Sequence, residues 1–293
     1  MRKMTDINQF SALLQRLAEG KKVIAVELDP PSDANNEKFI AGAEDLKDAG
    51  VDIITIADCP VGRPRMDSSI LACKLKRELG IDVLPHMTCR DRNITATKAL
   101  LLGLYAEGIR NILVVTGDPI IEADKDLVKT VFQFNSMGFA KFVTEMADTK
   151  LPGELGIFGA LNINAANFSF ELKRALEKED CGVVGFLTQP VLTHQAFLNL
   201  QTAKRELNSY ILGGIMPVVS EKNARYMNNE VGGINVDEKI IEMYVGLDRA
   251  EGEKLAIKIS SEIARRIEPY CDGLYLMTPF GRTGLIKEII KRI

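Results

Sequence analysis

Short apolar runs recur along this chain, and most of them end in a polar or charged residue. Residues 111–119 (NILVVTGDP) contain four consecutive apolar residues, which is typical of a strand buried on both faces of a parallel sheet. The run stops where Gly117 permits a close backbone approach and Pro119 prevents the strand from continuing. Because parallel α/β proteins keep their chemistry at the carboxyl ends of strands, Asp118 is a candidate site residue. The alternative is that Asp118 merely caps the turn or helix that follows.

This pattern occurs eight times, and the segments between the runs have apolar residues at helical spacing. Eight βα units in roughly 250 residues predict an α/β fold, a (β/α)8 TIM barrel, with residues 1–293 as a single domain. A doubly wound open sheet is the competing architecture, but it usually has fewer strands and a glycine motif after the first one. Neither GxGxxG nor GxxxxGK(S/T) occurs. The predicted strands are 23–29, 51–58, 81–88, 111–119, 156–164, 181–189, 210–217 and 273–279.

Helical spacing of apolar residues is strongest in residues 249–270. Residues 7–18 predict an extra N-terminal helix that closes the bottom of the barrel and ends before Gly20. Residues 121–149 are longer than a usual barrel crossover, which indicates an insertion at the catalytic face. Residues 220–236 are rich in asparagine and glycine, which suits an irregular loop with a short helix. Further helices are predicted at 35–49, 93–107 and 168–178.

The composition of the chain argues against several classes of function. The chain has 37 basic and 40 acidic residues, and it lacks a basic block interleaved with aromatics, so we expect no nucleic-acid partner. It has no signal-peptide core and no apolar run of membrane-spanning length, so we expect no membrane association. The five cysteines are odd in number and lack CxxC spacing. They predict reduced thiols in the cytoplasm, and they argue against a zinc or iron–sulfur site made by this chain alone.

In a barrel the strand ends meet at one mouth, so the polar residues that end these runs are expected to share a cavity. His86 is one of only two histidines, and a lone histidine after a strand is more often a packed, hydrogen-bonded residue than a catalyst. A metal site is disfavoured because no paired-histidine spacing occurs, and we expect none. The expected mouth residues are Glu27, Asp29, Asp58, His86, Asp118, Asn162, Asn164 and Gln189.

Glu27 is the most informative of these residues because it lies between the apolar Val26 and Leu28 in a predicted strand. Half-burial of a carboxyl raises its pKa, which suits a general acid near neutral pH. The alternative is a structural carboxylate that hydrogen-bonds the backbone at the rim. Asp29 points to the same face and is the rival proton donor, but Glu27 lies deeper in the strand. The basic loop at 59–67 fits either a solvated loop or a clamp on an anionic ligand.

Five short motifs, in order on successive strands, together resemble those of the methylenetetrahydrofolate reductases. The resemblance runs from about Lys22 to Arg282 and so covers nearly the whole chain. Residues 91–93 (DRN) and 228–231 (NNEV) are most similar to the reductase half of bacterial bifunctional homocysteine S-methyltransferase/methylenetetrahydrofolate reductases. The methyltransferase half, with its zinc cysteines, is absent from this sequence. The five motifs are 26–31 (VELDPP), 85–89 (PHMTC), 116–119 (TGDP), 187–190 (LTQP) and 214–217 (GIMP).

The resemblance implies a flavin-bearing (β/α)8 barrel that reduces 5,10-methylenetetrahydrofolate to 5-methyltetrahydrofolate. Glu27 matches the glutamate that protonates the bridging nitrogen of the folate and opens the ring to an iminium cation. Asp118 matches the aspartate beside the flavin, which tunes reduction and offsets the iminium charge. The other implied contacts are His86, Thr116, Gly117, Asn162, Asn164 and Lys178 to the flavin, with Lys178 near its phosphates, and Gln189, Asn223, Met227 and Arg282 to the folate.

The same resemblance implies the partners. FAD is expected rather than FMN, methylenetetrahydrofolate is the expected substrate, and a homo-oligomer is expected. NADH, NADPH, ferredoxin and an electron-donating partner protein are all open as electron donors. Three departures from the family pattern bear on the donor and on substrate stacking: Leu28-Asp29 replaces the usual aromatic pair, Thr116 replaces an arginine, and Met227 aligns with a stacking phenylalanine.

Two other function classes are alternatives. A non-redox barrel enzyme, such as a pterin-binding transferase or an aldolase, usually carries a catalytic lysine on a strand or a phosphate-binding glycine pair after strands seven and eight. No lysine lies within the predicted strand cores, whereas Gly281 and Gly284 leave room for the phosphate site. The third class is a non-catalytic folate-binding subunit of a larger complex.

Overall fold

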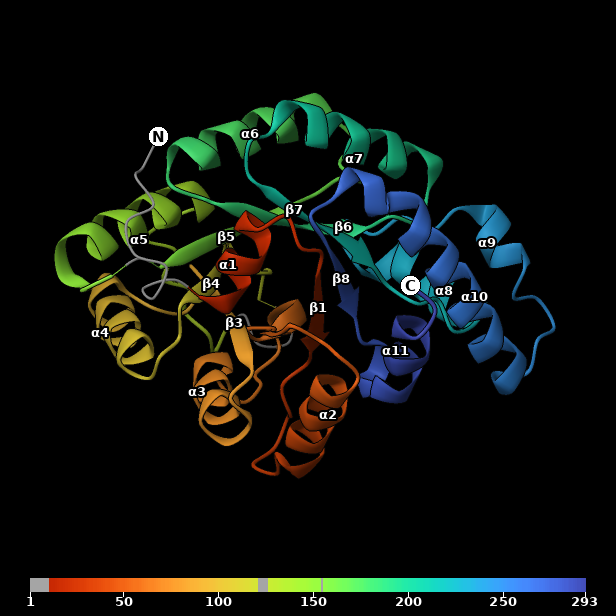
Figure 1. Ribbon diagram of the computed structural model, residues 1–293, viewed down its shortest axis with the longest axis horizontal. Coiled ribbons are helices and arrows are strands. Elements are labelled where there is room, and N and C mark those ends of the chain that lie inside the picture. The colour runs from red at the N-terminus through yellow and green to blue at the C-terminus, as the bar shows by residue number, and fades with distance from the viewer. Residues whose placement is uncertain (1–10, 121–125, 154) are drawn as a thin grey trace.

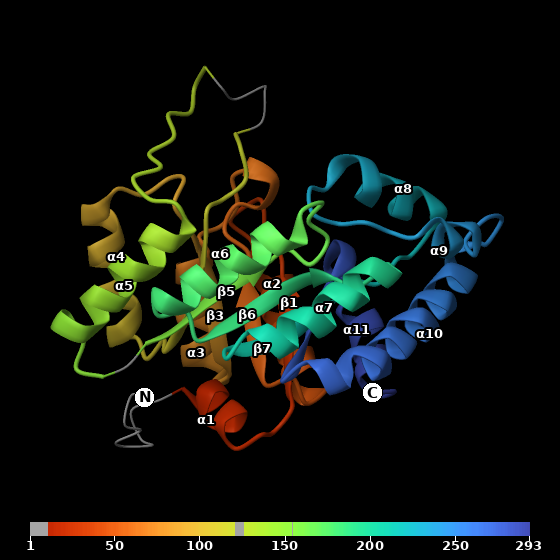
Figure 2. The same ribbon diagram turned by 90° about the horizontal axis from the view of Figure 1, so that it is seen from above.

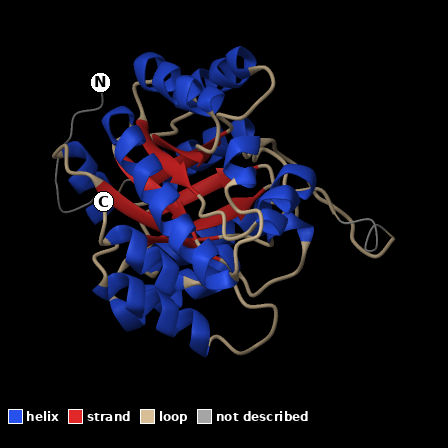
Figure 3. Ribbon diagram, turned by 90° about the vertical axis from the view of Figure 1, so that its right-hand side faces the viewer, coloured by secondary structure: helices blue, strands red, loops and turns tan. Residues whose placement is uncertain are grey.

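The computed structural model describes residues 11–120, 126–153 and 155–293. Within them, eight parallel strands form a closed barrel in sequence order, because each strand pairs with the next and the last pairs with the first. Helices surround the barrel (Figure 1, Figure 3). The predicted (β/α)8 barrel is therefore confirmed. The strands are β1 (Val23–Leu28), β2 (Ile53–Ile56), β3 (Asp82–Thr88), β4 (Asn111–Val115), β5 (Gly156–Leu161), β6 (Gly185–Pro190), β7 (Tyr210–Ile215) and β8 (Gly273–Met277).

The helices predicted from apolar spacing are present, and their ends differ from the prediction by a few residues. The first helix is described from residue 12, and the earlier part of its predicted span, residues 7–10, lies outside the described residues. The helices are α1 (Ala12–Ala18), α2 (Glu37–Asp48), α3 (Ser68–Leu79), α4 (Ile94–Ala106), α5 (Ser136–Lys150), α6 (Phe168–Asp180), α7 (His194–Glu206), α8 (Glu221–Glu230), α9 (Glu238–Glu242), α10 (Arg249–Ile267) and α11 (Thr283–Ile290).

Helix α1 closes the bottom of the barrel, as predicted. Its Leu13 and Leu17 are buried in the same apolar cluster as the inward-facing residues of the strands. The Leu13 N–H donates to Oδ2 of Asp82, the first residue of β3, at 3.1 Å. The N-terminal end of the barrel is thus filled by side chains, which leaves the opposite end for a site.

Strand β1 shows how side-chain alternation places the candidate acid. Val26 and Leu28 are buried between the strands and the helices, whereas Val23 and Ala25 belong to the apolar cluster inside the barrel. Because successive side chains of a strand point to opposite faces, Glu27 points into the barrel, at the carboxyl end of β1.

Two turns of similar sequence flank this end of β1. Residues 60–63 (PVGR) follow β2 and residues 279–282 (PFGR) follow β8, and both of these strands pair with β1. The second residue of each turn, Val61 or Phe280, has a positive φ, +50° and +53° respectively. Such values are unusual for residues other than glycine. The first turn is tightly packed, since a Cβ on Gly62 would lie 2.3 Å from a backbone oxygen of the loop after β4.

The segment between β4 and α5 is long, as predicted, and residues 121–125 of the predicted insertion lie outside the described residues. Its described residues 126–135 extend beyond the carboxyl ends of the strands, on the side opposite α1 (Figure 2). The Val131 N–H donates to the Arg90 carbonyl at 2.7 Å and so joins this loop to the one after β3. The short helix and irregular loop predicted at 220–236 are also present, as α8 and the residues after it. In the part of the chain that the structure describes, no helix has the length and apolarity needed to span a bilayer.

Candidate active site

A cavity of about 510 Å³ opens at the carboxyl ends of the strands, where barrel enzymes carry their chemistry. Each strand contributes a residue from its own end or from the loop that follows it. The volume lies within the usual range of small-molecule sites. The sequence-predicted residues that line the cavity are Glu27, Asp29, Asp58, His86, Gly117, Asp118 and Gln189.

Glu27 lies between side chains from two other strands. Its Oε2 accepts a hydrogen bond from the phenol of Tyr275 on β8. The same oxygen lies 3.6 Å from Nε2 of His86 on β3. The Glu27 side chain is 21% exposed, and that exposure opens onto the cavity.

Burial raises the pKa of Glu27 to about 7. The nearby Asp29 raises this pKa further, and the hydrogen bond from Tyr275 opposes the rise. Burial also lowers the pKa of His86 to about 3, so the imidazole is neutral and does not form an ion pair with the glutamate. Glu27 therefore holds its proton at a pH where an ordinary glutamate has lost it, which is the property a general acid needs.

The basic loop after β2 contributes one of its arginines to this region. Arg63 is exposed to solvent, whereas Arg65 is half-buried and lines the cavity. Burial raises the pKa of Asp29, and the positive charge of Arg65 opposes that rise. Arg65 thus favours the charged form of Asp29, and the Asp29 charge in turn favours the protonated form of Glu27.

Asp118 caps a turn, but this is the turn after β2 and not the turn or helix that follows Asp118 in the sequence; its catalytic role stays a prediction. Its Oδ2 accepts the Val61 N–H at 2.7 Å, so the carboxylate caps the strained turn after β2. Its own carbonyl accepts Nη1 of Arg90 at 3.0 Å. The Asp118 side chain is also exposed and lines the cavity, where its charge is available to a ligand.

The two residues before Asp118 differ in their placement. Gly117 lines the cavity with φ at +95°, and a Cβ there would lie 3.0 Å from Cβ of Thr88, so this position needs glycine. Thr116 is exposed and is not among the lining residues. The Thr116 carbonyl accepts the Cys89 N–H at 3.2 Å, which joins the ends of β3 and β4.

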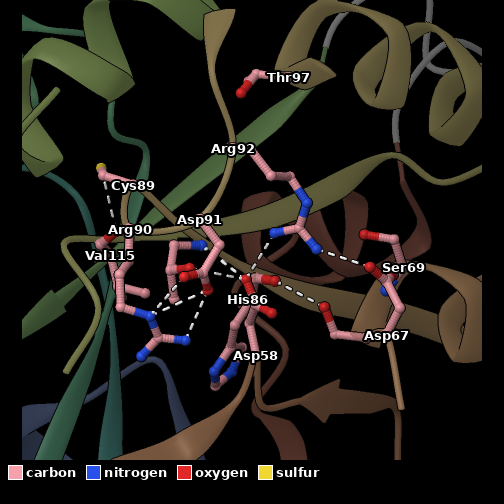
Figure 4. Close-up of polar contacts among 12 residues, drawn as sticks. Asp58, Asp67, Ser69, His86, Cys89, Arg90, Asp91, Arg92, Thr97 and Val115 are labelled. Atoms are coloured by element: carbon pink, nitrogen blue, oxygen red, sulfur yellow. Dashed lines mark hydrogen bonds and ion pairs between the residues drawn. The ribbon is translucent and has the colours of Figure 1, made fainter. Parts of the chain in front are cut away.

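An ion network behind the cavity fixes the loop after β3. Arg92 donates from Nη1 to Asp58 at 2.9 Å and from Nη2 to Asp67 at 2.7 Å, and Figure 4 shows it between the two carboxylates. The buried Asp58 also accepts the backbone N–H and the hydroxyl of Thr88, each at 3.0 Å. The ends of β2 and β3 and the start of α3 are thus linked. In the described ranges, no three His, Cys, Asp or Glu side chains gather as metal ligands would.

The structure does not bring the predicted flavin residues of β5 and α6 to the cavity lining. Asn164 donates from Nδ2 to the Pro190 and Gly233 carbonyls at 3.1 and 3.0 Å. Its backbone N–H donates to Oδ1 of Asn162 at 3.0 Å. Lys178 is buried, which lowers its pKa, and its Nζ donates to the carbonyl of the cavity-lining Ala160 at 2.9 Å. Asn162, Asn164 and Lys178 therefore bind backbone groups next to the cavity instead of lining it. Their contacts to a flavin stay predictions.

Of the predicted folate residues, only Gln189 lines the cavity. Asn223 accepts the Val219 N–H at 3.1 Å at the start of α8. Met227 is 1% exposed and belongs to an apolar cluster behind α8. Arg282 pairs with Glu253 at 3.0 Å beside a separate hollow. The substrate contacts of these last three residues stay predictions.

Two aromatic residues of the site were missed in the sequence. Tyr226 precedes Met227, lines the cavity and is 53% exposed, so it offers a ring to a ligand. Tyr275 lines the cavity next to Glu27 and is 5% exposed. The sequence contained no signal for either role, because Tyr226 lies in a polar helix and Tyr275 in an apolar strand.

The chain forms a parallel eight-stranded barrel, and ionisable side chains line a cavity at the carboxyl ends of its strands. This is the architecture of a barrel enzyme. A family model described as methylenetetrahydrofolate reductase matches residues 12–293. The chain therefore belongs to the methylenetetrahydrofolate reductase family, and the resemblance found in the five motifs is confirmed. The closer resemblance to the bifunctional enzymes stays a prediction.

Relatives from several organisms align with the chain. The 5,10-methylenetetrahydrofolate reductase of Salmonella typhimurium is 25% identical over 257 residues, which cover 85% of this chain and 83% of the relative. The probable methylenetetrahydrofolate reductase (NADPH) of Caenorhabditis elegans is 22% identical, over 96% of this chain and 43% of the relative. Alignments with 5,10-methylenetetrahydrofolate reductases of two Buchnera aphidicola strains cover 58% and 66% of those proteins' lengths.

Solved structures share the fold at low sequence identity. A Clostridium thermocellum protein described as binding two copies of 5-methyl-5,6,7,8-tetrahydrofolic acid superposes with a TM-score of 0.62 at 14% identity, over 96% of this chain and 97% of its own. A riboflavin lyase superposes with a TM-score of 0.57 at 11% identity, over 93% of this chain and 90% of its own. At these identities the likeness shows the barrel fold alone.

Because the pKa of Glu27 is raised, the free energy of unfolding should fall as the pH rises. The folded state binds the Glu27 proton more tightly than the unfolded state, so the stabilisation is complete below pH 4.5 and is lost as pH rises to about 7. Between pH 4 and pH 8, the wild type should lose about 2–3 kcal/mol of unfolding free energy relative to Glu27→Gln, which has no proton to lose. Urea titrations of both proteins across this range measure the difference. Parallel pH curves would contradict a raised pKa at this carboxyl.

Proposed function

We propose that this protein catalyses the flavin-dependent reduction of 5,10-methylenetetrahydrofolate to 5-methyltetrahydrofolate. The observation that carries the proposal is a half-buried carboxyl, Glu27, that keeps its proton near neutral pH inside a cavity of a chain of this family. The names of the bacterial relatives support the substrate. The description of the Clostridium thermocellum protein as a binder of methylated tetrahydrofolate agrees with it.

The first chemical requirement is a proton. Opening the five-membered ring of the substrate needs protonation of a weakly basic bridging nitrogen, and a general acid works best when its pKa lies near the operating pH. Glu27 meets that condition because burial raises its pKa to about 7. Asp29 also lines the cavity, but it follows the end of β1 and lies beside Arg65, whose charge favours the ionised form.

The second requirement is a negative charge near the cation that ring opening creates. Asp118 lines the same cavity, and its carboxylate is held by the Val61 amide. Glu27 itself becomes a carboxylate once it has given up its proton. Charges that are already held in place stabilise a developing cation more than free charges in bulk water would, because they need no reorganisation during the reaction.

The cavity residues fit a flavin in two respects. His86 Nε2 is buried without a hydrogen-bond partner and is therefore available to a polar group of a ligand. Gly117 lines the cavity without a side chain, so its backbone is available to a flat ring system there. A bound flavin would supply the hydride that converts the iminium carbon to a methyl group. His86, Gly117 and Asp118 are the residues we propose to hold it.

The remaining partners are proposed from the family resemblance. We take FAD as the flavin and a homo-oligomer as the assembly. A nicotinamide cofactor is the proposed electron donor, in agreement with the name of the Caenorhabditis elegans relative, and NADH is the alternative to NADPH. A partner protein is the other donor to be tested.

Glu27→Gln should separate the two half-reactions. The amide keeps the shape of the side chain but has no proton to give, so oxidation of the reduced flavin by methylenetetrahydrofolate should slow by ~10²–10⁴-fold. Reduction of the flavin by its donor should be nearly unchanged. Stopped-flow absorbance follows each step separately. Asp29→Asn is the matched control: if Asp29→Asn abolishes folate reduction while Glu27→Gln does not, the acid is Asp29.

Tyr226→Ala should weaken folate binding. An aromatic platform contributes about 0.5–1.5 kcal/mol beyond its buried area, so the KM for methylenetetrahydrofolate should rise about 2- to 10-fold. Met227→Leu is the control, because it conserves volume in the cluster behind α8. Steady-state kinetics measure both variants. A KM that rises in Met227→Leu but not in Tyr226→Ala would return the stacking role to Met227.

A further inference from the structure

The hydroxyl of Tyr275 is the direct protein partner of the candidate acid. Tyr275 lies on β8, the strand that pairs with β1, and its register partner is Ala25, two residues before Glu27. Its ring belongs to the apolar cluster inside the barrel, and the phenol reaches Oε2 of Glu27 from there. Packing in this cluster holds the ring, which limits the directions that its hydroxyl can take.

The two oxygens of Glu27 have different surroundings. Oε2 accepts the Tyr275 hydroxyl and lies 3.6 Å from the neutral His86 imidazole. Among the described residues, none donates a hydrogen bond to Oε1. An oxygen that accepts a phenol proton is a poor place for the proton of the acid itself. The proton of the neutral carboxyl therefore belongs on Oε1, which is the oxygen left for a ligand.

We propose that Tyr275 is a positioning residue that holds Glu27 by its Oε2, so that the acid delivers its proton from Oε1. This role rests on the proposed function, because it concerns the same ring-opening step. Tyr275 gives up no proton in that step: the proton moves from Oε1 of Glu27 to the folate nitrogen, and the carboxylate that remains keeps its hydrogen bond from the phenol.

The charged and titratable groups around Glu27 are consistent with this role. Asp29 lies just after the end of β1 and is faced by Arg65. His86 approaches Glu27 from β3, and Tyr275 approaches it from β8. Burial and the adjacent Glu27 hold the pKa of the Tyr275 phenol well above its usual range. The phenol therefore remains a hydrogen-bond donor throughout the pH range in which Glu27 titrates.

Tyr275→Phe is the test, because it removes the hydroxyl and keeps the ring. Two effects of different kinds are expected. The carboxylate loses a hydrogen bond that stabilises its charge, which raises the pKa of Glu27. In a plot of the rate of folate reduction against pH, the fall on the alkaline side (the alkaline limb) should therefore move up by about one pH unit. The carboxyl is also free to rotate, so the rate on the acid side of that limb should fall about 10-fold or more. Flavin reduction by the donor should be unchanged.

Tyr244→Phe is the matched control. Tyr244 is also a buried phenol, and it donates to the Val218 carbonyl in the cluster behind α8. This variant loses one buried hydrogen bond, as Tyr275→Phe does, but the alkaline limb should stay in place. A slower Tyr275→Phe enzyme with an unshifted limb would overturn the positioning role and leave Tyr275 as a packing residue.

A direct titration keeps the inference separate from the proposed function. The carbonyl stretch of the Glu27 carboxyl, assigned by its loss in Glu27→Gln, can be followed by infrared spectroscopy without substrate. Tyr275→Phe should move this titration to higher pH, whether or not the wild type reduces folate. If Tyr275→Phe does not fold, 3-fluorotyrosine at position 275, a more acidic donor, should move it to lower pH. An unchanged titration in the folded variant would contradict the proposal, whereas absent folate reduction with a shifted titration would contradict only the function.

Discussion

The architecture of the candidate site depends on the partial burial of one carboxyl, that of Glu27, which points into the barrel at its mouth. Glu27 faces inward at the end of β1, where its neighbours are a phenol and a neutral imidazole rather than a cation. Burial without a compensating positive charge makes loss of the proton unfavourable, and this is why the pKa rises to about 7. The same burial reduces stability at neutral pH, as is common where a site needs a strained or poorly solvated group.

The rest of the mouth holds this group in a defined place. The loops after β2, β3 and β4 are tied together by charge-assisted hydrogen bonds, from Arg92 to Asp58 and Asp67 and from the Val61 amide to Asp118. Such bonds are stronger than neutral ones and have fixed directions, so they can hold irregular backbone rigid without filling the cavity with apolar side chains. The apolar clusters on either side of the strands provide the rigid wall behind them.

The barrel and the half-buried carboxyl of Glu27 could be predicted from the sequence because both follow from local patterns. Buried parallel strands give unbroken apolar runs, and a glutamate within such a run faces either the helices or the interior. Other contacts depend on packing that no local pattern encodes. Adjacent helical residues point about 100° apart, which is why the cavity receives Tyr226 and not Met227. Lys178 is long enough for either a ligand or a carbonyl, and only the folded chain shows that it binds the Ala160 carbonyl.

The most direct test of the account is a single-turnover experiment with the wild-type protein as purified with its flavin. The protein is reduced chemically under anaerobic conditions until the flavin absorbance is bleached, and it is then mixed with 5,10-methylenetetrahydrofolate. The account predicts that the flavin absorbance returns, that one 5-methyltetrahydrofolate forms for each flavin reoxidised, and that the rate falls above about pH 7, where Glu27 loses its proton. A purified protein that takes up no flavin, or a bleached flavin that stays reduced in the presence of the substrate, would contradict it.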